Sequence, residues 1–173
     1  MRGVALVWAL AALVGCGGDS GLSRDVVTSL PDGNATGTAL SGQYRVTITT
    51  TSCAGACPSF QVLGVFTYSI CKVGDVDSNE TITTTQTDGH LEVVGDSSLF
   101  VQRLVGGVDA DGAFDIGGYE AQGEGQVDVT ARARGSISQS GLLQATAQAR
   151  GVGSAEGKSI NCVGSYTLSG QRQ

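Results

Sequence analysis

The fold of this chain is constrained most by two neighbouring segments in which apolar and polar residues alternate. Residues 126–137 and 142–150 carry small apolar side chains at every second position and polar ones between them. This is the period of a strand with one buried face. With Gln139 at the apex of the connecting turn, Asp128 is expected opposite Arg150, and the alanines of the two strands opposite one another. One face of this hairpin is then polar and the other apolar.

The same alternation recurs along the chain, between turns rich in glycine and aspartate. No segment shows a sustained helical period, and the 27 glycines also disfavour helices. Further strands are expected from Gly42 onward and at residues 62–73, 80–86, 91–94, 99–105, 113–116 and 162–168.

Eight or nine short antiparallel strands in simple succession predict an all-β fold. A single antiparallel up-and-down barrel is expected, because closure removes exposed strand edges. A β-sandwich is the alternative. The barrel predicts that the first strand, near Tyr44, lies beside the last, near Tyr166.

The N-terminus has the features of an export signal. One positive residue, Arg2, precedes an apolar run over residues 4–14. This run is too short to span a bilayer, which takes about 20 apolar residues, but it has the length of a signal-peptide core. It ends in Leu13-Val14-Gly15-Cys16, which resembles the lipobox of bacterial lipoproteins.

That resemblance implies lipid anchoring through Cys16, which would carry a diacylglyceryl group and an acyl chain such as palmitate. Leu13, Val14 and Gly15 are then the residues that the signal peptidase recognises. Gly17 stands where lipoproteins kept at the inner membrane often have Asp, so the outer membrane of the cell envelope is implied. An ordinary secretory signal followed by an incidental cysteine is the alternative.

Three parts of the chain are therefore expected. Residues 1–15 form a cleaved signal peptide, residues 16–41 the lipidated cysteine with a flexible tether, and residues 42–173 the barrel domain. About 24 coil residues reach roughly 25–30 Å, enough to hold a domain off a membrane.

The four cysteines of the domain, Cys53, Cys57, Cys71 and Cys162, suggest two disulfides. A metal site is the alternative, but Cys53 and Cys57 lack the two-residue spacing usual in zinc knuckles. In a barrel, Cys53 and Cys162 share a rim, so a bridge from Cys53 or Cys57 to Cys162 would lock the closure. Cys71 falls at the far end of a straight second strand unless Gly64 bends it, and the pairing stays open.

The charge distribution bears on the choice of partners. The net charge is −6 and no basic stripe is present, which argues against nucleic acid. Arg132, Arg134 and Arg150 gather on the polar face of the expected hairpin. They could contact lipopolysaccharide phosphates or an acidic partner, and a solvated strand face is the favoured alternative.

Catalytic groups are scarce in this chain. His90 is its one histidine. Ser20 and Ser97 follow Gly-Asp in segments that resemble the nucleophile block of GDSL esterases, but the late Asp and His of that family are missing. A hydrolase using Ser97 or His90 is therefore the less favoured alternative, and no catalytic residue or cofactor is expected.

Two acidic clusters are candidate calcium sites. Asp75, Asp77 and Asn79 have the alternating oxygen ligands that begin an EF-hand loop, but Glu80 replaces its glycine and Gln86 its glutamate. The second cluster is Asp109, Asp111 and Asp115. Both are more simply interpreted as turns.

The barrel interior is the remaining candidate site. Barrels of about eight strands are filled by side chains or hold one small ligand. The opposed alanines leave space, which six aromatic residues could fill: Phe60, Phe66, Tyr68, Phe100, Phe114 and Tyr166. Gly42-Gln43-Tyr44 resembles the Gly-x-Trp signature of lipocalins, with Tyr for Trp, and this resemblance implies ligand binding inside the barrel.

The expected function is thus a non-catalytic envelope lipoprotein that binds a small apolar molecule or an envelope partner. A structural or inhibitory surface module without a pocket is the alternative.

Overall fold

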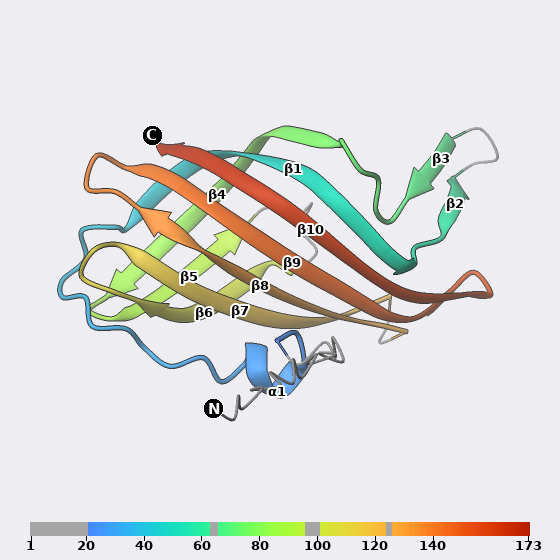
Figure 1. Ribbon diagram of the computed structural model, residues 1–173, viewed down its shortest axis with the longest axis horizontal. Coiled ribbons are helices and arrows are strands. Elements are labelled where there is room, and N and C mark those ends of the chain that lie inside the picture. Colours follow the sequence, from blue (N-terminus) through green and yellow to red (C-terminus); the bar gives the residue numbers. More distant parts are fainter. Residues whose placement is uncertain (1–20, 63–65, 96–100, 124–125) are drawn as a thin grey trace, which may run out of the picture.

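The computed structural model describes residues 21–62, 66–95, 101–123 and 126–173. Within them, eight antiparallel strands close into a barrel (Figure 1). These are β1 (Gly42–Ala56), β4 (Val76–Thr87), β5 (His90–Gly95), β6 (Arg103–Val108), β7 (Ala113–Gln122), β8 (Val127–Ile137), β9 (Leu142–Ala155) and β10 (Lys158–Arg172). A separate hairpin consists of β2 (Ser59–Val62) and β3 (Phe66–Ser69), and one short helix, α1, spans Arg24–Val27. The predicted all-β barrel is confirmed.

Closure joins the first strand to the last. β1 pairs with β10 on one side and with β4 on the other. Thr50 lies directly opposite Tyr166, so the first strand lies beside the last, as predicted for a barrel. Every other barrel strand pairs with its neighbours in the sequence, as an up-and-down topology requires.

The hairpin of β8 and β9 forms, but its register differs by two residues from the prediction. Thr130, rather than Asp128, lies opposite Arg150. The predicted ion pair between Asp128 and Arg150 is therefore wrong, and Asp128 instead accepts a hydrogen bond of 2.6 Å from the Tyr119 hydroxyl. A shift of two residues leaves every side chain on its predicted face, so the alanines still point inward.

The turn explains this shift. It is centred on Ser140 instead of Gln139, because the Ser138 N–H donates to the Leu142 carbonyl and closes a three-residue loop. Gly141 has φ +81°, in the left-handed region that glycine adopts at little cost.

A second correction concerns the strand expected at residues 62–73. The chain instead leaves the barrel here, and β2 pairs with β3, with Phe60 opposite Tyr68. In Figure 1 this hairpin lies beyond one end of the barrel. Because the chain turns back, Cys71 returns to the barrel rim, where a straight strand would not have placed it.

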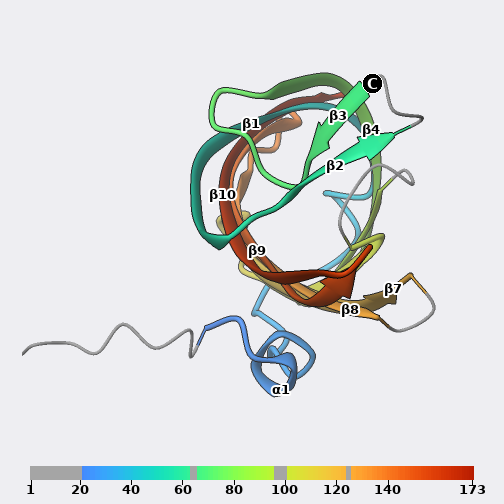
Figure 2. The same ribbon diagram turned by 90° about the vertical axis from the view of Figure 1, so that its right-hand side faces the viewer.

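Residues 21–41, here called the strap, pack against the barrel, in contrast to the flexible tether expected there. α1 lies outside the wall formed by β7 and β8 (Figure 2). Val27, the last residue of α1, is fully buried, and the Arg24 guanidinium lies 3.9 Å from the centroid of the Tyr119 ring. An apolar contact and a cation–π contact thus hold the helix in place.

The strap continues to one end of the barrel and closes it. The Gly33 N–H donates to the Gly89 carbonyl at 2.8 Å, and the Ala35 N–H to the Val108 carbonyl at 3.1 Å. Ala35 and Leu40 are buried in the main hydrophobic core together with inward-facing barrel residues. These contacts make the strap an integral part of the fold.

Glycines of the barrel make room for the strap. A Cβ atom on Gly117 would lie 2.6 Å from the Val27 carbonyl oxygen, and one on Gly107 would lie 2.5 Å from the Pro31 carbonyl oxygen. Both distances are too short for a side chain. The strap backbone therefore rests directly on the barrel backbone.

Replacing Gly117 by alanine should loosen the strap. We expect the free energy of unfolding to fall by about 1–3 kcal/mol, as in other overpacked sites, and proteolysis within residues 21–41 to become faster. Urea unfolding and limited proteolysis measure both effects. Gly151→Ala is the control, since its Cβ would make only ordinary contacts, the nearest at 3.6 Å. Equal behaviour of the two variants would contradict this account.

Candidate functional site

The barrel encloses a cavity of about 520 Å³. Its wall extends from Ile137 and Leu143 near the strap to Ile70 and Cys71 beside the β2–β3 hairpin. Seen from that side, the hairpin lies in front of part of the opening (Figure 2). The volume falls within the range of about 300–1,000 Å³ that small-molecule pockets occupy.

Small side chains create this space. The alanines of β8 and β9 that line the cavity are Ala131, Ala133, Ala145, Ala147 and Ala149. They face one another in pairs, Ala131 with Ala149 and Ala133 with Ala147. A wall of methyl groups cannot fill the interior of an eight-stranded barrel.

Three of the six aromatic residues considered from the sequence can be placed. Phe114 and Tyr166 line the cavity, and Phe60 packs with Ile160 and Cys162 in a smaller cluster at the hairpin. The side chains of the other three, Phe66, Tyr68 and Phe100, lie outside the described part of the structure. Among the described residues, Phe114 and Tyr166 thus line the interior without filling it.

The strap end of the cavity is sealed by hydrogen bonds around Tyr44, which is completely buried. The Arg172 guanidinium donates to the Tyr44 hydroxyl at 2.8 and 3.0 Å and to the Ala39 carbonyl at 2.7 Å. The Tyr44 hydroxyl in turn donates to the Leu40 carbonyl at 3.1 Å. A ligand must therefore reach the cavity from the hairpin end.

Charged groups of the wall gather at that hairpin end. The described lining residues with charged side chains are Lys72, Asp75, Asp77 and Glu80. Glu80 is only 8% exposed, whereas the other three are exposed at the rim. The cavity thus has an apolar interior and a charged mouth.

Two disulfides join the hairpin to this rim. Cys53 bonds to Cys71 and Cys57 to Cys162. The predicted bridge from the first strand to Cys162 is confirmed, with Cys57 as the partner. The rival metal site is wrong, because all four sulfurs are in disulfides.

Two residues of the first calcium candidate lie at the cavity rim. Asp75 and Asp77 border the cavity, while the side chain of Asn79 lies outside the described part of the structure. Among the residues that are described, no group of three or more His, Cys, Asp or Glu side chains is arranged to hold a metal ion.

The second calcium candidate does not form a cage. The Asp109 carboxylate accepts the Asn34 N–H at 3.1 Å, and the Asp111 carboxylate accepts the Ala113 N–H at 3.0 Å. These bonds are those of turns.

Of the candidate hydrolytic residues, His90 alone falls within the residues that the structure describes. The His90 Nδ1 lies 2.7 Å from the Asp32 carboxylate of the strap, far from the cavity mouth. Ser20 and Ser97 lie outside the described residues, as do the lipobox residues Leu13, Val14, Gly15 and Cys16.

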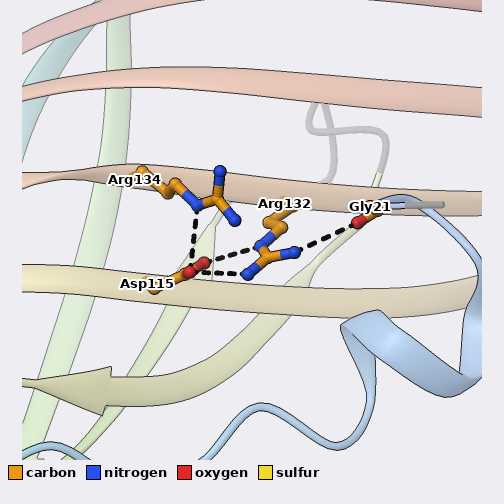
Figure 3. Close-up of polar contacts among 4 residues, drawn as sticks. All are labelled: Gly21, Asp115, Arg132 and Arg134. Atoms are coloured by element: carbon orange, nitrogen blue, oxygen red, sulfur yellow. Dashed lines mark hydrogen bonds and ion pairs between the residues drawn. The ribbon is translucent and has the colours of Figure 1, made fainter. Parts of the chain in front are cut away.

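Two arginines of the predicted patch share one carboxylate partner, Asp115. Arg132 makes two hydrogen bonds to Asp115, of 2.6 and 2.7 Å, and Arg134 adds one of 2.9 Å (Figure 3). Arg132 also approaches the Gly21 carbonyl of the strap at 3.4 Å. Arg150 instead donates to the Asn161 side chain at 3.2 Å. Arg132 thus links the strap to the barrel wall.

Burial of the Asp115 carboxylate disfavours its ionisation, but the hydrogen bonds and charges of Arg132 and Arg134 outweigh this and lower its pKa. A carboxyl group with a lowered pKa in the folded state stabilises the fold above its ordinary pKa, and this stabilisation is lost as the pH falls. Asp115→Asn should therefore cost about 1 kcal/mol at pH 7, and less in acid.

Urea unfolding of this variant at several pH values measures the effect. Asp25→Asn, at an exposed strap position, is the control. A deficit for Asp115→Asn that is constant down to acid pH would show that the ionised carboxylate is not the stabilising group.

Sequence reasoning missed Glu80 and Lys72 as lining residues. A signal for Glu80 was present, since it continues the inward-facing positions of Ile82, Thr84 and Gln86 along one strand. Lys72 had no comparable signal, because its place at the rim depends on the turn of the β2–β3 hairpin.

Comparisons with protein-family models, with curated proteins and with solved structures give no match for this chain. Among the described residues, no helix is both long and apolar enough to cross a membrane. The cavity and the sequence of the N-terminus are therefore the features of this chain that bear on its function.

Proposed function

We propose that this protein is a non-catalytic lipoprotein of the bacterial cell envelope that holds a small, largely apolar molecule inside its barrel. The observation that carries this proposal is the cavity of about 520 Å³. Its described wall consists of alanines, aliphatic residues and two aromatic residues, and the end beside the β2–β3 hairpin is bordered by polar groups. This combination of apolar lining and few polar groups is typical of small-molecule sites.

Binding of an uncharged fluorescent probe tests the proposal. N-phenyl-1-naphthylamine becomes brighter in apolar surroundings, and we expect saturable binding with one probe per protein. Linear, non-saturable fluorescence with this probe would contradict a binding cavity.

The envelope location is supported by the lipobox-like Leu13-Val14-Gly15-Cys16 and by the disulfides, which persist in oxidising compartments. Gly17 favours the outer membrane. Two or more acyl chains on Cys16 would make the anchoring stable, because each buried CH₂ contributes about 0.8 kcal/mol.

Expression of the full chain in a bacterium with radiolabelled palmitate tests this anchor. We expect label in the wild-type protein and none in Cys16→Ser. Label that persists in Cys16→Ser would contradict lipidation at this residue.

A further inference from the structure

The charged residues of the cavity wall come from one short stretch of the chain. Lys72 and Asp75 lie between β3 and β4, and Asp77 and Glu80 lie in the first half of β4. The other described lining residues are apolar or uncharged. Three acidic groups and one basic group therefore leave the mouth of the cavity with a net negative charge.

A β-bulge turns two of these carboxylates toward the interior. Asp77 lies opposite Ile48 and Glu80 opposite Val46, with a register shift between the two pairs. Residues three apart on a regular strand face opposite sides, but a bulge places them on the same side. Val46 is buried in the core and Ile48 lines the cavity, so both carboxylate residues share the inner face.

The burial of Glu80 strengthens the effect of its charge on a bound ligand. Glu80 is 8% exposed and lies just inside the mouth, next in the inward-facing row to Ile82. The effective dielectric constant around a buried group is well below that of water, so charge complementarity with a ligand matters more there than at the surface.

We propose that the ligand is an amphiphile with a positively charged end, such as a long-chain amine or an alkylammonium compound. This inference rests on the proposed binding function. The apolar chain would lie against Phe114 and the alanines, and the cationic group would lie near Glu80 and Asp77. A fatty acid in the same pose would bring its carboxylate against like charges, which disfavours its binding.

Lys72 provides the competing possibility. It is the one basic residue among the described lining residues, and it would favour an anionic head group. It is exposed at the rim, whereas Glu80 is buried. A solvated ammonium group attracts an anion weakly, so we expect the carboxylates to determine the preference.

Competition against the bound naphthylamine probe tests the inference with three ligands of one chain length. These are dodecylamine, dodecanol and dodecanoate, each used below its critical micelle concentration at pH 7. We expect dodecylamine to displace the probe at a concentration at least about tenfold lower than dodecanoate, with dodecanol between them.

Variants then locate the origin of the preference. In Glu80→Gln combined with Asp77→Asn, the ratio between the affinities for dodecylamine and dodecanoate should approach one. Glu156→Gln is the matched control, since it removes an exposed carboxylate from the β9–β10 turn, outside the cavity. Thermal melting confirms that each variant is folded.

The outcomes separate the two proposals. A probe that binds, together with an equal or stronger affinity for dodecanoate, overturns the cationic ligand but leaves the binding function standing. Loss of dodecanoate binding in Lys72→Gln would identify an anionic ligand instead. Failure of the probe and of all three ligands overturns the binding function itself.

Discussion

Replacing Cys57 and Cys162 by alanine should lower the free energy of unfolding by about 4–5 kcal/mol. This disulfide spans a sequence separation of 105 residues and joins the end of β1 to β10, the strand that closes the barrel. Its removal releases a long loop in the unfolded chain, which gains conformational entropy. Urea unfolding followed by circular dichroism gives the free energy.

The other disulfide is the internal control for this prediction. Cys53 and Cys71 are separated by only 18 residues, so Cys53→Ala with Cys71→Ala should cost about 3 kcal/mol. An equal or larger loss from this second pair would mean that loop length does not determine the stabilisation in this barrel.

Replacing Ala147 by tryptophan should weaken binding of the naphthylamine probe about 30- to 100-fold. Ala147 lies in the middle of the cavity wall, opposite Ala133 on one side and Tyr166 on the other. An indole ring there would take about 2–3 kcal/mol of apolar burial from the ligand. Stability should stay unchanged or rise, because the ring fills space that no side chain occupies.

Gln144→Trp is the matched control for this variant. It adds the same ring to the same strand, but on the exposed outer face, and probe binding should be unaffected. If both variants bind the probe as the wild type does, the probe lies outside the barrel. If Ala147→Trp lowers the free energy of unfolding, the cavity in solution is smaller than about 520 Å³.

The strands and their faces could be predicted from the alternation of residues, even where the pairing was wrong. In β8 and β9, the alternation of polar and apolar residues determines which side chains point inward. The predicted register, with Asp128 opposite Arg150, and the observed one, with Thr130 there, put the same side chains inside. The register depends on the turn, where the hydrogen bond from Ser138 to Leu142 selects a loop one residue further along the chain. Such a choice leaves only a weak trace in the sequence.

The strap was missed for a different reason. Its contacts are between backbones, such as that of Val27 against Gly117, and a glycine that accommodates a distant segment looks like any strand or turn glycine. The burial of Leu40 likewise depends on partners such as Gln86, whose side-chain oxygen accepts the Leu40 N–H at 2.9 Å. Polar composition alone made this segment resemble a linker.

The candidate site was foreseen in outline. The alanine pairs predicted space in a barrel, and the structure places a cavity there. The chemistry of its mouth was not foreseen, because the inward direction of Asp77 depends on a β-bulge and that of Lys72 on a hairpin outside the barrel. Local irregularities of this kind re-aim side chains without a clear signature in the residue pattern.

If Cys16 carries lipid, as proposed above, the docked strap also limits the length of chain between the barrel and the membrane. Gly21 follows Cys16 by only five positions, and its carbonyl is already held near Arg132 on the barrel wall. Even a fully extended chain of that length covers about 18 Å. With lipid on Cys16, the wall of β7 and β8 would lie close to the bilayer surface. An amphiphile that leaves the lipid headgroups would then meet the barrel within a short diffusion distance.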